Sequence, residues 1–114
     1  MMRRKLFGKE FELVDLSNEG NNDIVFNNLV STIEYLYLVI EHNELILGGS
    51  ILVYDSKRRQ YNYNCGWTYN GTDNQESLRK ALDYLKRVLE LNPNVTWKVE
   101  VSVTGEGIEY IKFK

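Results

Sequence analysis

The stretch 60–69 constrains the fold more than any other part of this 114-residue chain, because two kinds of side chain alternate along it. One set is aromatic or apolar, and the other set is polar or glycine. Successive side chains of a strand point to opposite faces of a sheet, so the alternation predicts a strand with one buried face. We expect the core face to carry Tyr61, Tyr63, Cys65, Trp67 and Tyr69. The opposite, wet face is expected to carry Gln60, Asn62, Asn64, Gly66 and Thr68.

Further strands are indicated on both sides of this stretch. The run 50–55 leads into a polar turn at 55–59, which predicts a hairpin with 60–69. Gly48 and Gly49 precede that run and predict a bulge or bend after 44–47. The segment 95–103 alternates strictly and turns Trp97 and its valines to one side. A first strand is expected over 11–16, starting as early as Lys5, and a closing strand over 108–113.

A long amphipathic helix is predicted over about 74–91. Its apolar positions recur at helical spacing and form one stripe of Leu78, Ala81, Leu82, Leu85, Val88 and Leu89. Thr72 or Asp73 is placed to cap its first turn, and Pro93 stops it.

The segment 24–40 allows two interpretations. Helical spacing of apolar residues holds up to about Glu34, and the run 35–40 then favours a strand by propensity. We therefore predict a short helix over about 23–33 and a strand over about 35–41. The alternative is one long helix to His42, ended by Asn43 in the left-handed conformation.

These elements predict a single α+β domain over 1–114. We expect a two-layer sandwich with a mainly antiparallel sheet of five or six strands, and with both helices packed on one face. The 43% hydrophobic and 12% aromatic content excludes a disordered chain. The most apolar run, 35–40, is too short for a membrane span, no signal peptide is visible, and one cysteine fits a reducing compartment. We expect a cytoplasmic protein that does not bind a membrane.

The sequence offers little for catalysis. One His and one Cys exclude a Cys/His zinc site within a single chain. His42 and Cys65 lie far apart in sequence, and the glycines fit turns and bulges rather than a phosphate-binding loop. We therefore expect a protein that is not an enzyme, with no catalytic residues, no cofactor and no metal.

Charge is distributed unevenly along the chain, although the formal net charge is only −2. Between 10 and 56 every charged residue is acidic, whereas basic residues outnumber acidic ones from Lys57 onward. The leading hypothesis is a small binding or inhibitor protein that occludes a partner with a basic surface, of the immunity-protein or phage anti-defence type. Its partner-binding residues would be Glu34, Tyr35, Tyr37, Glu41, Glu44 and Asp55. Whether the acidic block forms one surface patch stays open.

The alternative hypothesis is a module that binds single-stranded nucleic acid. A basic turn followed by alternating tyrosines can contact phosphates and stack bases, and it would use Lys57, Arg58, Arg59, Tyr61 and Tyr63. The polar character of the other side of 60–69 opposes this hypothesis, because it leaves the tyrosines as the apolar face for the core. A homodimer that pairs 51–54 or the closing strand across an edge is a third possibility.

Overall fold

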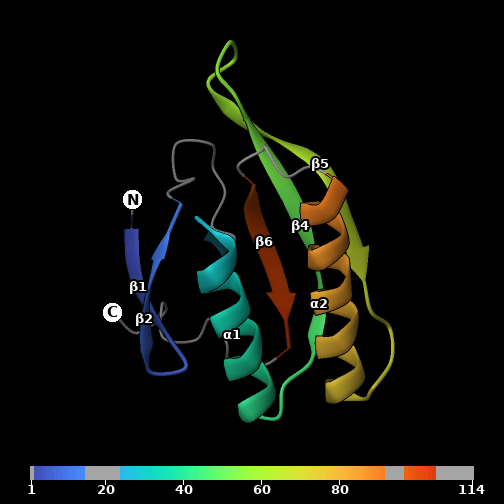
Figure 1. Cartoon of the computed structure of the whole chain (residues 1–114). Helices are drawn as coiled ribbons and strands as arrows, with labels where there is room; N and C mark the ends of the chain where they lie inside the picture. The colour runs from blue at the N-terminus through green and yellow to red at the C-terminus, as the bar shows by residue number, and fades with distance from the viewer. Residues whose placement is uncertain (1, 15–23, 92–96, 105–114) are drawn as a thin grey trace.

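The computed structural model describes residues 2–14, 24–91 and 97–104, and it confirms an α+β fold with a six-stranded antiparallel sheet and two helices. Helices α1 (Leu29–Glu41) and α2 (Asn74–Leu91) lie side by side on one side of the sheet (Figure 1). We call this side the inner face, and the side that neither helix covers the outer face. The strand order is β1 (Met2–Leu6), β2 (Lys9–Leu13), β3 (Val25–Phe26), β6 (Lys98–Val103), β4 (Ile46–Asp55) and β5 (Gln60–Thr68).

The first strand of the sequence prediction is two strands in the structure. β1 and β2 form a hairpin whose turn is made by Phe7 and Gly8, both with positive φ, 52° and 80°. Such a turn suits glycine but strains phenylalanine. Burial stabilises Phe7 there, because its ring stacks on the ring of His42 with centroids 4.5 Å apart. The predicted strand is therefore confirmed over 11–13, its start at Lys5 is wrong, and positions 15 and 16 lie outside the described residues.

Helix α1 corrects the preferred interpretation of 24–40. The predicted start at about 23 is wrong, because Val25 and Phe26 form strand β3. The helix begins at Leu29 and ends at Glu41, and Asn28 caps it by accepting a hydrogen bond from the Ser31 amide at 2.9 Å. Asn43 has a φ of 59°, as the alternative interpretation expected. The buried positions follow helical spacing and are Thr32, Tyr35, Leu36, Val39 and Ile40. Burial of this face outweighs the strand propensity of the aromatic and β-branched residues, so the predicted strand over 35–41 is wrong.

The β4–β5 hairpin is present, with one irregularity in its register. Ile51 lies opposite Cys65, and Leu52 lies opposite Tyr63, so Asn64 is an extra residue in β5. A bulge of this kind shifts the alternation of the strand by one residue. The side chains after the bulge keep the expected inward orientation, whereas those before it are reversed.

The bulge divides the aromatic stripe between the two faces of the sheet. Trp67 and Tyr69 are buried, and Cys65 packs against the same core. Tyr61 instead packs in the outer-face cluster of Val14, Val25 and Leu52, and Tyr63 is 67% exposed. The prediction that all five side chains face the helices is therefore wrong for Tyr61 and Tyr63.

Gly48 and Gly49 lie in one continuous strand rather than between two. The pairing of β4 with β6 shifts register between Ile46 and Gly48, which is the predicted bulge. A side chain at Gly49 would collide with the Trp67 ring and with the Glu100 carbonyl oxygen. Glycine at this position therefore lets Trp67 pack directly on the backbone of β4.

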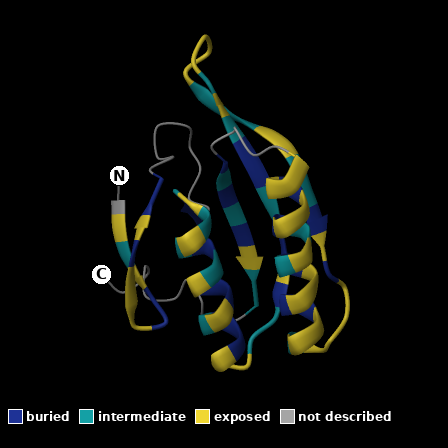
Figure 2. Cartoon of the chain, viewed as in Figure 1, coloured by how far each residue is buried: buried dark blue, intermediate teal, exposed yellow. Residues whose placement is uncertain are grey.

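Helix α2 and strand β6 complete the inner core. Asp73 caps α2, since its Oδ1 accepts hydrogen bonds from the amides of Gln75 at 3.0 Å and Glu76 at 3.3 Å. Leu78, Ala81, Leu85 and Val88 are buried, whereas Leu89 is 40% exposed. Trp97, Val99 and Val101 enter the same core from the strand side. Figure 2 shows that both helices turn their buried sides to the sheet and leave the opposite sides exposed.

The topology limits where a second chain could pair. β4 has β5 on one side and pairs with β6 on the other as far as Leu52, so 51–52 offers no free edge for the proposed pairing over 51–54. The sheet edges are β1 and β5 among the described strands. The predicted closing strand over 108–113 lies outside the described residues. Neither α1 nor α2, the two helices that the structure describes, has the length and apolarity needed to cross a membrane.

Candidate functional site

Three tyrosines lie together on the outer face of the β4–β5 hairpin. Tyr54 lies opposite Tyr61 in the register, and the two ring centroids are 5.1 Å apart at an interplanar angle of 61°. Tyr63 follows two residues along β5, past the ring of Tyr61. Tyr54 and Tyr63 are 49% and 67% exposed. The outer face therefore presents two aromatic rings, those of Tyr54 and Tyr63, that are accessible to a ligand.

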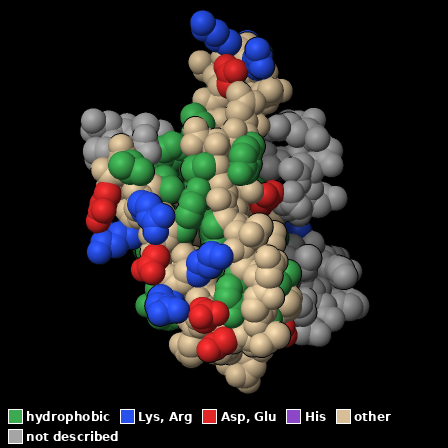
Figure 3. Space-filling view, turned by 90° about the vertical axis from the view of Figure 1, so that its right-hand side faces the viewer, with side chains coloured by type: hydrophobic (Ala, Val, Ile, Leu, Met, Phe, Trp, Pro, Cys, Tyr) green, Lys and Arg blue, Asp and Glu red, His purple; other side chains and the backbone are tan. Residues whose placement is uncertain are grey.

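The hairpin ends in a basic tip, which we define as Lys57, Arg58 and Arg59. Asp55 fixes the turn, because its Oδ1 accepts hydrogen bonds from the amides of Lys57 at 3.0 Å and Arg58 at 3.3 Å. The Arg58 Nε also lies 3.8 Å from Asp55 Oδ2. All three basic side chains are exposed. Figure 3 shows Lys and Arg gathered at the tip, with hydrophobic side chains in a strip below it.

A shallow depression of about 240 Å³ lies at the other end of this surface. Gly66 lies in it and lies opposite Ser50. A Cβ atom on Gly66 would approach the Tyr63 hydroxyl to 3.2 Å, so the Tyr63 ring leans over this glycine. The depression is lined by Gly49, Ser50, Tyr63, Gly66, Trp67 and Thr68.

The acidic residues predicted to bind a partner do not form one surface. Glu44 precedes β4 and Asp55 ends it, so these two carboxylates lie at opposite ends of a ten-residue strand, about 30 Å apart. Asp55 therefore belongs with the basic tip. Glu44 accepts a hydrogen bond from the Thr104 hydroxyl at 2.7 Å.

Helix α1 carries the remaining predicted partner-binding residues. Glu34, Tyr37 and Glu41 share its exposed side with Val30, at helical spacing. Glu34 pairs with Lys9 Nζ at 2.6 Å, which neutralises part of this side. Tyr35 has no exposed surface and packs against Phe26 with ring centroids 4.9 Å apart. Tyr35 is therefore a core residue, and its predicted role as an exposed anchor is wrong.

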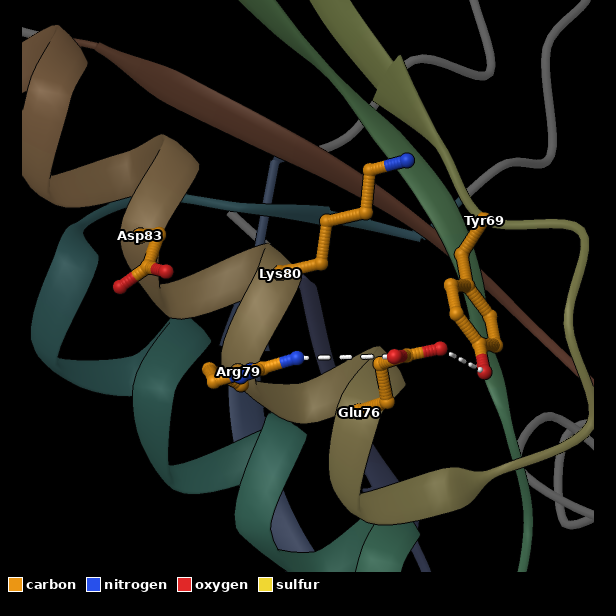
Figure 4. A pocket seen from close by; sticks show the side chains of 5 residues that line it. All are labelled: Tyr69, Glu76, Arg79, Lys80 and Asp83. Carbon is orange, nitrogen blue, oxygen red and sulfur yellow. Dashed lines mark hydrogen bonds and ion pairs between the residues drawn. The ribbon is translucent and has the colours of Figure 1, made fainter.

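A second depression, of about 370 Å³, lies between the end of β5 and α2 (Figure 4). The Tyr69 hydroxyl donates to Glu76 Oε1 at 2.9 Å and accepts from the Asp73 amide at 3.1 Å. Burial is the largest cause that raises the pKa of Tyr69 above its ordinary value. Arg79 lies 3.5 Å from Glu76, and Lys80 and Asp83 complete the lining. Two cations face two carboxylates here, so this depression has no net charge to select a ligand.

The single His and the single Cys are engaged in structural contacts. His42 Nδ1 lies 2.8 Å from the Leu38 carbonyl oxygen, and its ring stacks on Phe7. Cys65 lies beside Tyr84, whose pKa is raised to about 12, chiefly by desolvation and then by a hydrogen bond with the thiol. Among the residues that the structure describes, no group of three or more His, Cys, Asp or Glu side chains is arranged to hold a metal.

Sequence reasoning missed two parts of the outer-face surface. Tyr54 is on the face of Leu52 rather than that of Ile51, a position that the alternation of 50–55 could have indicated. The depression at Gly66 could not have been found, because it depends on the bulge at Asn64.

Comparison with known protein families, with curated proteins and with solved structures finds no match to this chain.

Proposed function

We propose that this protein binds single-stranded nucleic acid with the outer face of its β4–β5 hairpin. One observation carries the proposal: the bulge at Asn64 turns Tyr61 and Tyr63 away from the core, onto the face that also carries Tyr54. The polar side of 60–69 opposed this function in the sequence, because it assigned these rings to the core. The rings now lie on the same hairpin as the basic tip.

The tyrosines suit the base of a nucleotide, and the basic tip suits its phosphate. Stacking on an aromatic side chain contributes about 1–3 kcal/mol per base and tolerates every base, because each base has a π-face. Cationic side chains at the tip bind phosphates and release counterions. A β5 strand of nine residues gives this surface a length of about 30 Å, long enough for several nucleotides. The formal net charge of −2 provides no overall attraction for nucleic acid, so we assign the attraction to the exposed cations of the tip.

The proposal is for binding without catalysis. The His42 ring and the Cys65 thiol both have structural partners, and neither is placed beside a second catalytic group in the contacts described above. Stacking and phosphate contacts need no bond to form or break. The protein would act by covering or presenting a strand.

A labelled oligonucleotide tests this function. Fluorescence anisotropy with a fluorescein-labelled single strand is measured at salt concentrations of about 50 and 200 mM. Three phosphate contacts by Lys57, Arg58 and Arg59 predict a slope of log affinity against log salt of about −2, or an affinity loss of about 20-fold. Absence of salt-sensitive binding at the lower concentration would remove the proposal.

A matched pair of variants locates the contact. Lys57→Ser with Arg58→Ser removes two tip charges, and the slope of log affinity against log salt is expected to flatten from about −2 to about −0.7. Arg79→Ser with Lys80→Ser removes the same charge from the exposed side of α2. The second variant should bind as the native protein does. Equal losses in the two variants would show that only overall charge matters.

A second candidate function is the occlusion of a basic protein by the exposed side of α1. Glu41 is the last residue of α1, where the helix dipole is negative, and the last turn carries no basic residue. A carboxylate there destabilises the helix by about 0.3–1 kcal/mol, and Glu44 lies just beyond it. A cationic partner would offset this repulsion, with the half-exposed Tyr37 as its aromatic contact.

A co-purification experiment separates the second candidate from the first. The native protein and a variant with Glu41→Lys and Glu44→Lys are used as baits in a host extract treated with nuclease. A basic protein retained by the native bait and lost from the variant supports occlusion. A partner whose retention changes neither with the two charge reversals nor with added salt contradicts occlusion of a basic protein.

A further inference from the structure

We infer that the depression beside Tyr63 is a slot for one unpaired nucleobase, which stacks on the Tyr63 ring; this rests on the nucleic-acid binding proposed above. We call it the base slot and define it by Ser50, Tyr63, Gly66 and Thr68, four of the residues that line the depression. The base slot would add direct contact with a base to the phosphate binding at the basic tip.

The first step in the argument is the position of the Tyr63 ring. The ring leans over Gly66, since a Cβ atom there would lie 3.2 Å from the Tyr63 hydroxyl. The side chain is nevertheless 67% exposed, so one side of the ring is open. An exposed aromatic ring held along a sheet is the arrangement on which single-stranded bases stack.

The second step is the shape and chemistry of the floor. Gly66 lies in the hollow of about 240 Å³, and a Cβ atom there would lie 2.6 Å from the Gly49 carbonyl oxygen, so the close packing of the two strands requires glycine at this position. Ser50 lies opposite Gly66 and Thr68 lies opposite Gly48 in the register. Both hydroxyls can donate and accept hydrogen bonds, so they suit the polar edge of a heterocyclic base. An apolar ligand would leave these hydroxyls unused.

The third step is the relation of the base slot to the basic tip. Arg59 directly precedes β5 and Tyr63 lies four residues further along the chain, at most about 13 Å away, with the Tyr54–Tyr61 pair between them. A strand whose phosphates contact the tip therefore reaches the base slot within a few nucleotides. A base in a duplex is stacked on both faces and paired at one edge, so only a single-stranded or flipped base can enter.

The experiment compares two labelled strands of the same length, one of deoxythymidine and one of abasic sites, by fluorescence anisotropy. Both strands carry the same phosphates, so they differ only in the bases. The native protein is expected to bind the deoxythymidine strand at least about 5-fold more tightly, the lower limit of one stacked base. Tyr63→Leu should remove most of this preference and leave the affinity for the abasic strand unchanged.

Control variants keep the outcomes distinct. Tyr37→Leu removes a half-exposed tyrosine from α1 and should change neither affinity. Thr68→Val keeps the shape of the rim and removes one hydroxyl. It should lower the affinity for the deoxythymidine strand and leave the affinity for the abasic strand unchanged. Circular dichroism checks that each variant is folded.

Three results would overturn parts of this inference. Equal affinity of the native protein for the two strands rejects the base slot and leaves phosphate binding by the tip in place. If Tyr63→Leu lowers the affinity for both strands equally, the base slot is also rejected, because the ring would then contact the sugar–phosphate backbone rather than the base. Failure of the native protein to bind either strand at low salt rejects the proposed function and the base slot together.

Discussion

The ring of Tyr61 packs against the ring of Tyr54, with centroids 5.1 Å apart, on the face of the sheet opposite Trp67. In the sequence, Tyr61 and Trp67 are an even number of residues apart and so belong on the same face. The extra residue Asn64 separates them. The distribution of aromatic rings between core and surface thus depends on one exposed asparagine.

Deletion of Asn64 should remove the bulge and leave Tyr61 and Tyr63 on the outer face, because Tyr63 would then directly precede Cys65 in a regular strand. We expect the free energy of unfolding to change by less than about 1 kcal/mol, because the cluster of Val14, Val25 and Leu52 keeps the Tyr61 ring. Urea unfolding followed by tryptophan fluorescence measures the change. Asn64→Ala keeps the bulge and should change stability by less than about 0.5 kcal/mol. A deletion variant less stable than the native protein by more than about 2 kcal/mol would place the irregularity elsewhere.

Tyr35→Phe should leave the protein as stable as before or stabilise it by up to about 1 kcal/mol. The Tyr35 hydroxyl is buried and has no hydrogen-bond partner among the described residues, so its removal relieves a desolvation cost. Tyr69→Phe is the matched comparison, because the Tyr69 hydroxyl contacts Glu76 and the Asp73 amide. Loss of those bonds should cost about 1 kcal/mol. Equal destabilisation by both substitutions would indicate that Tyr35 has a partner.

Alkaline pH should unfold the native protein more readily than the Tyr35→Phe variant. Burial raises the pKa of Tyr35 in the folded state above the ordinary value of about 10. Above that pH the unfolded chain releases the proton while the folded chain retains it, so stability falls as pH rises. The contribution is complete below about pH 10 and is lost between pH 10 and the raised folded value. Between pH 8 and 11, the urea midpoint should fall less steeply with rising pH in the variant than in the native protein.

Glu41→Gln should stabilise α1 by about 0.3–1 kcal/mol, because it removes a negative charge from the negative end of the helix. Thermal unfolding at low salt measures the gain, and added salt should reduce it. Glu34→Gln is the control, since Glu34 pairs with Lys9 and its loss should cost up to about 1 kcal/mol. A destabilised Glu41→Gln variant would contradict the dipole argument and the second candidate function with it.

The regular elements could be predicted from sequence where one local pattern agreed with the burial. Helix α2 has an unbroken apolar stripe from Leu78 to Val88 and a cap at Asp73, so spacing and capping indicate the same structure. The β4–β5 hairpin is indicated by the polar turn after Asp55. Helix α1 lacked this agreement. Its residues between Tyr35 and Ile40 prefer strands, and only contact with the sheet decides for a helix.

The candidate site was predicted only in part, for a different reason. Lys57, Arg58, Arg59, Tyr61 and Tyr63 were identified from the basic turn and the aromatic alternation. Their accessibility could not be predicted, because alternation in 60–69 continues unbroken through Asn64. A bulge is defined by the partner strand, and the pairing of Ile51 and Leu52 is not visible in β5 alone.

Asn64 also affects the free side of the outermost strand. Among the strands that the structure describes, β5 has a neighbour on one side only, so its other side offers backbone amides and carbonyls to an extended chain. An unbroken row of nine residues with several aromatic rings would be a template for aggregation. The extra residue interrupts that row and twists the strand. The irregularity that exposes the tyrosines therefore also disfavours edge-to-edge pairing of β5 with a second extended chain.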